Sequence, residues 1–248
     1  MTSFLFPLVA VASGVLAFVV VRLRLGVWRA ESFEGVSPVT LTPLSVLAGF
    51  LVGFLALHVW GEWDKAKSYV GEEATALREA VVLARVIDPA LGQAMKADVR
   101  AHVARMPDEW RDMAEHRLTL GAPPPELTRA IGRLTAQPVA GPAQQIAVER
   151  CLDAIDRALE ARRYRILLSE HGGVGAANWA ALLVLTACLQ LSIAGVHTAN
   201  RGAQVVALSI FTVAVATCFA VLAAYDHPYR DWPTGVGYGP IAEAAARL

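Results

Sequence analysis

Long apolar stretches alternate with charged segments along the chain. Four of these stretches are close to or above the length of about 20 residues that a helix needs to cross a bilayer. They cover residues 4–21, 43–60, 176–196 and 203–224. A short polar turn around Asn200 separates the last two, which predicts an antiparallel hairpin. The pattern therefore predicts four membrane-spanning helices, two on either side of a long middle segment.

The middle segment has a helical pattern of its own. Its apolar residues recur every three or four positions, and no alternating run rich in Val or Ile indicates a strand. Proline predicts helix boundaries at four places in this segment. These are Asp88-Pro89, Met106-Pro107, Pro123-Pro124-Pro125 and Gly141-Pro142. We therefore expect an all-α fold.

The same alternation predicts the domain boundaries. We expect the first two transmembrane helices within residues 1–60 and a soluble helical domain over residues 61–175. The hairpin of the third and fourth transmembrane helices then covers residues 176–225. A C-terminal tail over residues 226–248 completes the chain.

Two apolar stripes lie near the ends of the middle segment. The first, with spacings of four, three, four and three, consists of Val70, Ala74, Leu77, Val81 and Ala84. The second consists of Val148, Leu152, Ile155, Leu159 and Ile166, with Arg162 at one of its positions. Such seams pack one helix against another, so they predict an antiparallel stalk next to the membrane. No proline occurs between Leu44 and Ile87, and we expect the second span to continue into this stalk as one helix.

Composition supports a membrane protein and excludes other classes. Hydrophobic residues make up 55% of the chain and charged residues 18%, with a mean hydropathy of +0.45, whereas globular proteins average roughly 25% charged residues. The 22 basic and 22 acidic residues cancel, which leaves no surplus for nucleic-acid binding. The three cysteines lack metal-ligand spacing, and no catalytic motif is present. We expect no nucleic-acid partner, no metal or other cofactor, and no enzymatic activity.

One face of the second predicted span carries candidate pore residues. Phe50, Phe54 and His58 follow one another at intervals of four and so share a helix face. Around the axis of an oligomer, the two phenylalanines would form apolar rings of the kind that gates ions by dewetting. His58 would add a proton-dependent positive charge at the pore mouth. The alternative is a packed or lipid-facing pair of phenylalanines with an interfacial histidine.

Other residues near the spans suggest packing and anchoring. Gly49 and Gly53 form a G-x-x-x-G pattern, which permits close approach of another helix either within one subunit or between subunits. Trp60, Trp63 and Trp179 lie near predicted span ends, where tryptophan favours the headgroup region. We expect these three residues to act as interfacial anchors.

A basic cluster precedes the third predicted span. It consists of Arg162, Arg163 and Arg165. Such a cluster attracts anions to a vestibule or contacts anionic lipid head groups. The alternative is ion pairing with acidic residues of the partner stalk helix. The candidate partners on that helix are Glu62, Asp64 and Glu72.

Three segments resemble a family of bacterial membrane proteins with a bestrophin-like domain (DUF4239). The first is the exit of the second span, residues 59–66, followed by the V-x-x-E-A-x-x-L run from Val70 to Leu77. The second runs from Arg162 to Arg165 and continues to Trp179. The third resembles a D-x-P-F motif and consists of Asp226, His227, Pro228 and Tyr229, with tyrosine in place of the commoner phenylalanine. A structural alternative for Asp226 is a turn-forming carboxylate at a helix end.

The resemblance implies, by analogy with bestrophins, an oligomeric channel of five subunits. It further implies an anion-selective pore, with chloride as the permeating ion and the second span as its lining. The implied location is the bacterial inner membrane, with lipid around the spans and the soluble domain in the cytoplasm. Basic residues near the span ends favour that orientation only when the long middle segment is counted. The alternative function is a non-conducting scaffold or sensor that signals through its helical soluble domain.

Overall fold

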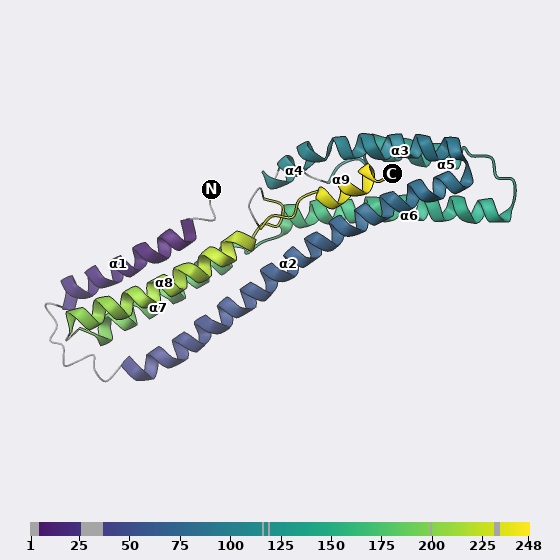
Figure 1. Ribbon diagram of the computed structural model, residues 1–248. Coiled ribbons are helices and arrows are strands. Elements are labelled where there is room, and N and C mark those ends of the chain that lie inside the picture. The colour runs from purple at the N-terminus through teal and green to yellow at the C-terminus, as the bar shows by residue number, and fades with distance from the viewer. Residues whose placement is uncertain (1–4, 26–36, 116, 119, 199, 231–233) are drawn as a thin grey trace. The chain divides into compact units, whose positions relative to one another are not determined.

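The computed structural model describes residues 5–25, 37–115, 117–118, 120–198, 200–230 and 234–248. Every regular element in these ranges is a helix (Figure 1). The chain divides into two compact units. The first comprises Met1–Gly61 and Gly173–Asp226, and the second comprises Glu62–Gly172 and His227–Leu248.

Four long apolar helices build the first unit. They are α1 (Leu5–Leu25), the first part of α2 (Ser37–Ile87), α7 (Ala176–Val196) and α8 (Arg201–Tyr225). Each is long and apolar enough to cross a membrane. The turn between α7 and α8 is short, because α7 ends at Val196 and α8 begins at Arg201. Asn200 caps α8 by accepting a hydrogen bond from the Ala203 backbone N–H at 3.2 Å. The predicted four spans and the hairpin are confirmed, although Phe4 lies outside the described residues.

A buried hydrogen-bonded group ties α1 to α7 and α8. Gln190 is fully buried and accepts a hydrogen bond from the Ser13 hydroxyl at 2.6 Å. Its amide nitrogen donates to the Ala10 carbonyl at 3.0 Å and to the Thr212 hydroxyl at 3.1 Å. The helices approach closely here because Gly14 has no side chain, and a Cβ at that position would lie 2.7 Å from Thr212 Oγ1. These polar side chains therefore stabilise helix packing.

The helix α2 continues without a break from the first unit into the second. It contains 51 residues, which corresponds to about 75 Å at 1.5 Å per residue. This confirms the expectation of one continuous helix up to Ile87. The helix also begins earlier than expected, at Ser37, and includes Pro43. Pro43 lies inside the helix and removes the one helical hydrogen bond that an N–H at this position would donate.

The second unit combines the remainder of α2 with five further helices. These are α3 (Pro89–Ala104), α4 (Met106–Ala114), α5 (Pro125–Thr135), α6 (Pro142–His171) and α9 (Gly239–Ala246). All four predicted boundaries coincide with helix ends. Asp88 separates α2 from α3 and accepts a hydrogen bond from the Ala90 backbone N–H at 2.9 Å. Proline suits the first turn of each following helix because the N–H groups there have no helical partner.

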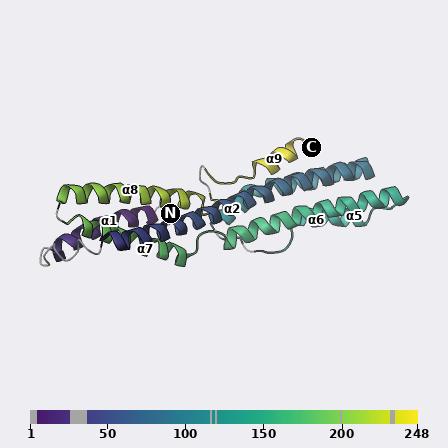
Figure 2. The ribbon, with the colours of Figure 1, turned by 90° about the horizontal axis from the view of Figure 1, so that it is seen from below.

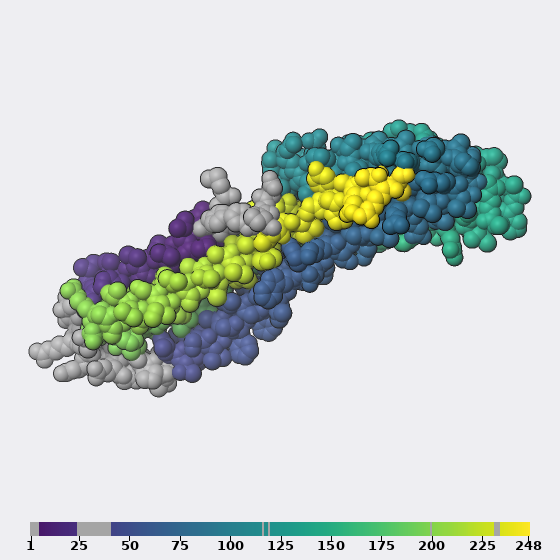
Figure 3. All heavy atoms as spheres, viewed as in Figure 1, coloured from purple at the N-terminus to yellow at the C-terminus, as the bar shows by residue number. Residues whose placement is uncertain are grey.

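The C-terminal segment is part of the second unit. In Figure 3, α9 lies along the other helices of this unit, and Ile241 and Ala245 are buried in its core. Trp63 and Trp110 also hold the segment, since their indole N–H groups donate to the Thr234 and Val236 carbonyls at 2.7 and 2.8 Å. The segment predicted as the C-terminal tail therefore packs within the second unit from His227 onward.

Helices α2 and α6 form the predicted antiparallel stalk (Figure 2). Tyr69 stacks on Tyr164 with ring centroids 5.4 Å apart, and further along α2 the Cys151 thiol donates to the Ala80 carbonyl at 3.3 Å. All five residues of the α2 stripe are buried. On α6 the predicted stripe is confirmed in part, since Val148, Ile155 and Ile166 are buried, and small residues next to the other two positions make the closest approach. Fully buried there are Cys151, Ala154, Ile155 and Ala158, whereas Leu152 and Leu159 are half-buried.

Gly92→Ala should destabilise the second unit. A Cβ at Gly92 of α3 would lie 2.7 Å from the Arg85 Cα of α2, and backbone at that distance must shift. Overpacking of this kind costs about 1–3 kcal/mol. The matched control is Gly132→Ala in α5, where a Cβ meets open space and helix propensity favours alanine by about 1 kcal/mol. Thermal unfolding of the detergent-solubilised protein should show a lower midpoint for the first variant only, and equal midpoints would contradict the contact.

Candidate functional site

The first unit leaves one face of α2 uncovered. Leu55 and Val59 of α2 are buried in a cluster with Trp179. On the other side of the helix, Phe50 and Phe54 expose 64% and 68% of their surface. Large apolar side chains in this position are covered in the membrane by lipid or by another copy of the chain. The structure therefore places both predicted phenylalanines on a free surface.

Leu57 belongs to the same exposed face. It exposes 67% of its surface and, at about 100° per residue, lies about 20° around the helix from Phe50. His58 is also exposed, but it lies about 80° from Phe50, on the flank of the face. A search for positions exactly four residues apart predicts His58 on this face and misses Leu57. The mixed interval of three and four that follows one face of an α-helix would have found it.

Gly49 and Gly53 lie on the other flank of this face. A Cβ at either position would meet no atom of the described chain within 4 Å. Packing against the described part of the same subunit therefore does not explain the G-x-x-x-G pattern. The surface at these glycines is open to a helix of another copy or to lipid.

The three tryptophans have different surroundings. Trp179 is buried, stacks on Phe6 with ring centroids 3.9 Å apart, and contacts Phe219 edge-on at 5.8 Å. It is a core residue of the first unit, which corrects its assignment as an interfacial anchor. Trp63 belongs to the second unit, is half-buried, and has Lys67 Nζ 3.7 Å from its ring centroid. Trp60 alone of the three is exposed and remains available as an anchor.

The basic cluster on α6 consists largely of ion-paired side chains. Arg165 is fully buried, and its Nη2 lies 2.9 Å from Glu73 Oε2 and 2.7 Å from Glu109 Oε1. Arg162 binds the other Glu109 oxygen at 2.7 Å. Only Arg163 is exposed. Burial removes Arg165 from any surface on which it would attract anions or lipid, so the structure corrects that assignment.

This buried cluster joins four helices of the second unit. Glu73 of α2 also lies 3.2 Å from His102 Nε2 of α3, and the Arg165 guanidinium lies 4.1 Å from the ring centroid of Trp110 in α4. Burial by itself would lower the pKa of Arg165, but Glu73 and Glu109 outweigh it and raise the pKa. Arg165 is therefore charged, and the cluster holds α2, α3, α4 and α6 together through charge-assisted hydrogen bonds.

Glu109→Gln should weaken the acid sensitivity of the second unit. Burial would raise the pKa of Glu109, but Arg165 and Arg162 lower it below the ordinary value of 4.5. A carboxyl with a lowered pKa stabilises the fold above its ordinary pKa, and this contribution is lost as the pH falls through the lowered value. Unfolding midpoints measured from pH 7 to pH 3 should fall less steeply for Glu109→Gln than for the unmodified protein. Parallel curves would contradict the ion pairing of Glu109.

The predicted C-terminal motif begins in the first unit and continues into the second. Asp226 is buried and accepts a hydrogen bond from the Val174 backbone N–H at 2.5 Å, so it ties the end of α8 to the segment before α7. This contact joins two segments 52 residues apart in the sequence and gives Asp226 a structural role. Pro228 and Tyr229 are buried in the second unit. Within the described ranges, no group of three or more His, Cys, Asp or Glu side chains is placed to hold a metal ion.

Four apolar helices and a helical second unit define the class of protein. It is an all-α membrane protein. The family model of the bestrophin-like domain matches residues 8–231. The chain therefore belongs to the bestrophin-like family.

Solved structures share this fold. A point mutant of a bacterial bestrophin homologue from Klebsiella pneumoniae superposes with a TM-score of 0.71 at 13% identity, covering 100% of this chain and 97% of that chain. A second mutant of that homologue gives a TM-score of 0.69 at 14% identity, with 100% and 98% coverage. A mutant described as a membrane protein gives 0.70 at 13% identity, with 98% and 95% coverage. At these identities the likeness shows the fold. Comparison with curated proteins found no match.

Proposed function

We propose that the chain forms a homo-oligomeric ion channel whose pore is lined by the exposed face of α2. The observation that carries this proposal is how little of the α2 span its own chain covers. In the most apolar part of the α2 span only 11% of the residues are buried, whereas the corresponding share in the other three spans is 22–33%. The open glycine flank fits the approach of a neighbouring copy. A closed ring of copies turns one uncovered helix face per subunit into a pore wall.

The chemistry of this face suits a gated pore. Phe50, Phe54 and Leu57 would form successive apolar rings around the axis, and narrow apolar rings stop ions when water leaves them. His58 would lie at the rim of the wall, where protonation adds positive charge. This mechanism needs neither a catalytic group nor a cofactor, consistent with a protein that is not an enzyme.

Anions are the ions that we propose for this pore, with chloride as the permeating ion. From Phe50 to Trp60 the α2 sequence contains no acidic residue, and its one ionisable side chain, His58, carries positive charge when protonated. Cation pores commonly use rings of Asp or Glu, which this segment lacks. Membership of the bestrophin-like family supports an oligomeric channel, and we propose a closed ring of five subunits.

The remaining assignments follow from the spans. We propose that the protein lies in a bacterial inner membrane, with lipid around the outer faces of the spans. Trp60 would lie at the headgroup level. We further propose that the second unit is cytoplasmic and that the exposed Arg163 contacts anionic head groups or permeating anions.

Ion flux in reconstituted liposomes tests the proposed function. Liposomes that contain the purified protein should release chloride faster than protein-free liposomes and faster than they release potassium. Faster potassium release would contradict the anion selectivity. Absence of flux at every pH and ion tested would contradict the channel and favour the non-conducting scaffold or sensor.

Subunit stoichiometry tests the ring independently. Native mass spectrometry of the detergent-solubilised protein should show a closed oligomer, with five subunits expected. A stable monomer or dimer would leave too few copies of α2 to enclose a pore.

A further inference from the structure

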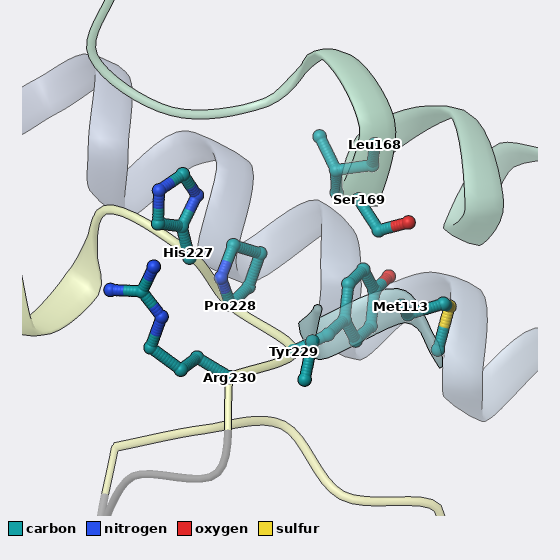
Figure 4. A pocket seen from close by; sticks show the side chains of 8 residues that line it. Met113, Leu168, Ser169, His227, Pro228, Tyr229 and Arg230 are labelled. Atoms are coloured by element: carbon teal, nitrogen blue, oxygen red, sulfur yellow. The ribbon is translucent and has the colours of Figure 1, made fainter. Parts of the chain in front are cut away.

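A groove runs between α2 and α9 on the surface of the second unit. Its volume is about 420 Å³, and its lining includes Thr75, Arg78 and Val82 of α2 and Ala244 of α9. A second hollow of this unit, beside Tyr229, measures only about 10 Å³ (Figure 4). Of these two hollows, the groove is therefore the one that can receive side chains of another molecule.

Arg78 gives the groove an unmatched positive charge. Its side chain is exposed, and no described residue forms an ion pair with it. The carboxylates that line the groove already have partners. Glu79 pairs with Arg157 of α6 at 2.7 Å, and Glu243 pairs with Arg247. The groove therefore suits a partner surface that brings further carboxylates.

The outward face of α6 carries such carboxylates. Four exposed acidic residues recur at intervals of four, three and four, so they share one face of the helix. They are Glu149, Asp153, Asp156 and Glu160. Among the described residues, Asp153 and Asp156 have no ion-pair partner. Arg150 is exposed only on the flank of this face, about 90° around the helix from its centre. The same chain thus has unmatched charges of opposite sign on α2 and on α6.

These unmatched charges lie at the same level of the stalk. Helices α2 and α6 are antiparallel, and the hydrogen bond from the Cys151 thiol to the Ala80 carbonyl fixes their register (Figure 2). Arg78 lies two residues before Ala80, and Asp153 lies two residues after Cys151. Because the helices run in opposite directions, Arg78 and Asp153 are level with each other.

Rotation from one subunit to the next preserves this level. Helix α2 also contains a membrane span, so it runs along the membrane normal, as the axis of a ring of membrane proteins does. Arg78 of one subunit therefore comes level with Asp153 of the next. Val86 and Ile146, which are 72% and 55% exposed, also match in level to within about 1.5 Å, the rise of one residue. They add an apolar contact beside the charges.

We infer that the α2–α9 groove of one subunit binds the acidic face of α6 of the next subunit. In this contact Arg78 pairs with Asp153 and Asp156 of the partner subunit. Two different faces that meet in this way pass the contact from copy to copy, which closes into a ring. The inference rests on the closed ring of the proposed function and assigns that ring a contact in the second unit.

Disulfide cross-linking of the full-length protein tests the contact. The exposed Cys188 and Cys218 are first replaced by serine, and the buried Cys151 is kept. The double variant Arg78→Cys with Asp153→Cys carries both halves of the contact in every subunit. Mild oxidation should therefore produce a ladder of covalent multimers up to the full ring on a denaturing gel.

A second double variant is the matched control. Arg78→Cys is combined with Arg100→Cys, because Arg100 is exposed on α3 rather than on the acidic face of α6. This variant should migrate as a monomer after the same oxidation. Equal ladders in the two double variants would overturn the inference.

Native mass spectrometry of the same samples before oxidation separates this inference from the proposed function. A ring that forms no covalent ladder would overturn the contact between α2 and α6 and leave the ring itself standing. A monomer would contradict the ring and the inference together.

Exchange of the charges tests the pairing itself. Arg78→Asp places a carboxylate against the acidic face, and like charges in contact oppose association. The ring should then dissociate on dilution at a severalfold higher protein concentration. Adding Asp153→Arg to the same chain should restore part of the loss, because the two positions interact. Equal dissociation of the single and double variants would overturn the pairing, and if Arg78→Asp does not fold, the cross-linking decides.

Discussion

Phe54→Ala should raise chloride flux severalfold in reconstituted liposomes. Each subunit of the proposed ring contributes one copy of Phe54, which is 68% exposed in the single chain. Replacing the benzyl side chains with methyl groups widens the narrow apolar constriction and lowers the barrier to its hydration. The measurement is the initial rate of chloride efflux per reconstituted oligomer.

Ile210→Ala is the matched control for this prediction. Ile210 on α8 is equally exposed, at 67%, but lies on a different span from the proposed pore lining. Its replacement should leave the efflux rate unchanged. If Phe54→Ala assembles normally and conducts like the unmodified protein, Phe54 does not lie in the constriction.

Arg165→Met should cost the second unit about 3–5 kcal/mol of stability, the usual penalty for removing one partner of a buried ion pair. The fully buried Glu73 would lose its arginine partner, with its carboxylate still shielded from water. Glu109 would keep only Arg162. Denaturant unfolding of the purified protein, followed by tryptophan fluorescence, measures the loss.

Arg163→Met is the control for the buried cluster. Arg163 is exposed on the same helix, and surface substitutions of this kind change stability by about 0.5 kcal/mol or less. The double variant Arg165→Met with Glu73→Gln should lose less than the sum of its single variants, because the two residues interact. Equal stability of Arg163→Met and Arg165→Met would contradict the assignment of a buried, charged cluster.

Features that depend on short stretches of sequence could be predicted. The four spans follow from apolar length, and the helix boundaries follow from Asp88 and the prolines after it. The α2 side of the stalk follows from the regular spacing that begins at Val70. These signals depend on residues close together in the chain, so one sequence is enough to interpret them.

Features that depend on the register between distant helices could not be predicted. The α6 stripe predicts Arg162 in the seam, but the small residues Ala154 and Ala158 shift the contact and bury Arg165 instead. The partner Glu109 lies on a separate helix 56 residues earlier, and nothing local in the sequence pairs them. The position of Trp179 near a span end likewise predicts an interfacial anchor. Its burial against Phe6 depends on a contact with a helix that is distant in the sequence.

The proposed pore face shows both kinds of signal. Its helix and the positions of Phe50 and Phe54 follow from periodicity. The exposure of this face cannot be predicted from periodicity. A helix that is apolar on all sides gives no sequence signal for the side that the rest of its own chain covers. The structure adds that Leu55 is buried and Leu57 exposed, only two residues apart.

Thiol labelling at position 54 tests the central claim most directly. In a background with the exposed Cys188 and Cys218 replaced by serine, Phe54→Cys is compared with Ile210→Cys after treatment with a charged, membrane-impermeant methanethiosulfonate reagent. If α2 lines a water-filled pore, the reagent should reach position 54 and alter chloride flux, while Ile210→Cys should conduct as before. Complete labelling of Phe54→Cys, verified by mass, with no change in flux would contradict a pore lined by this face.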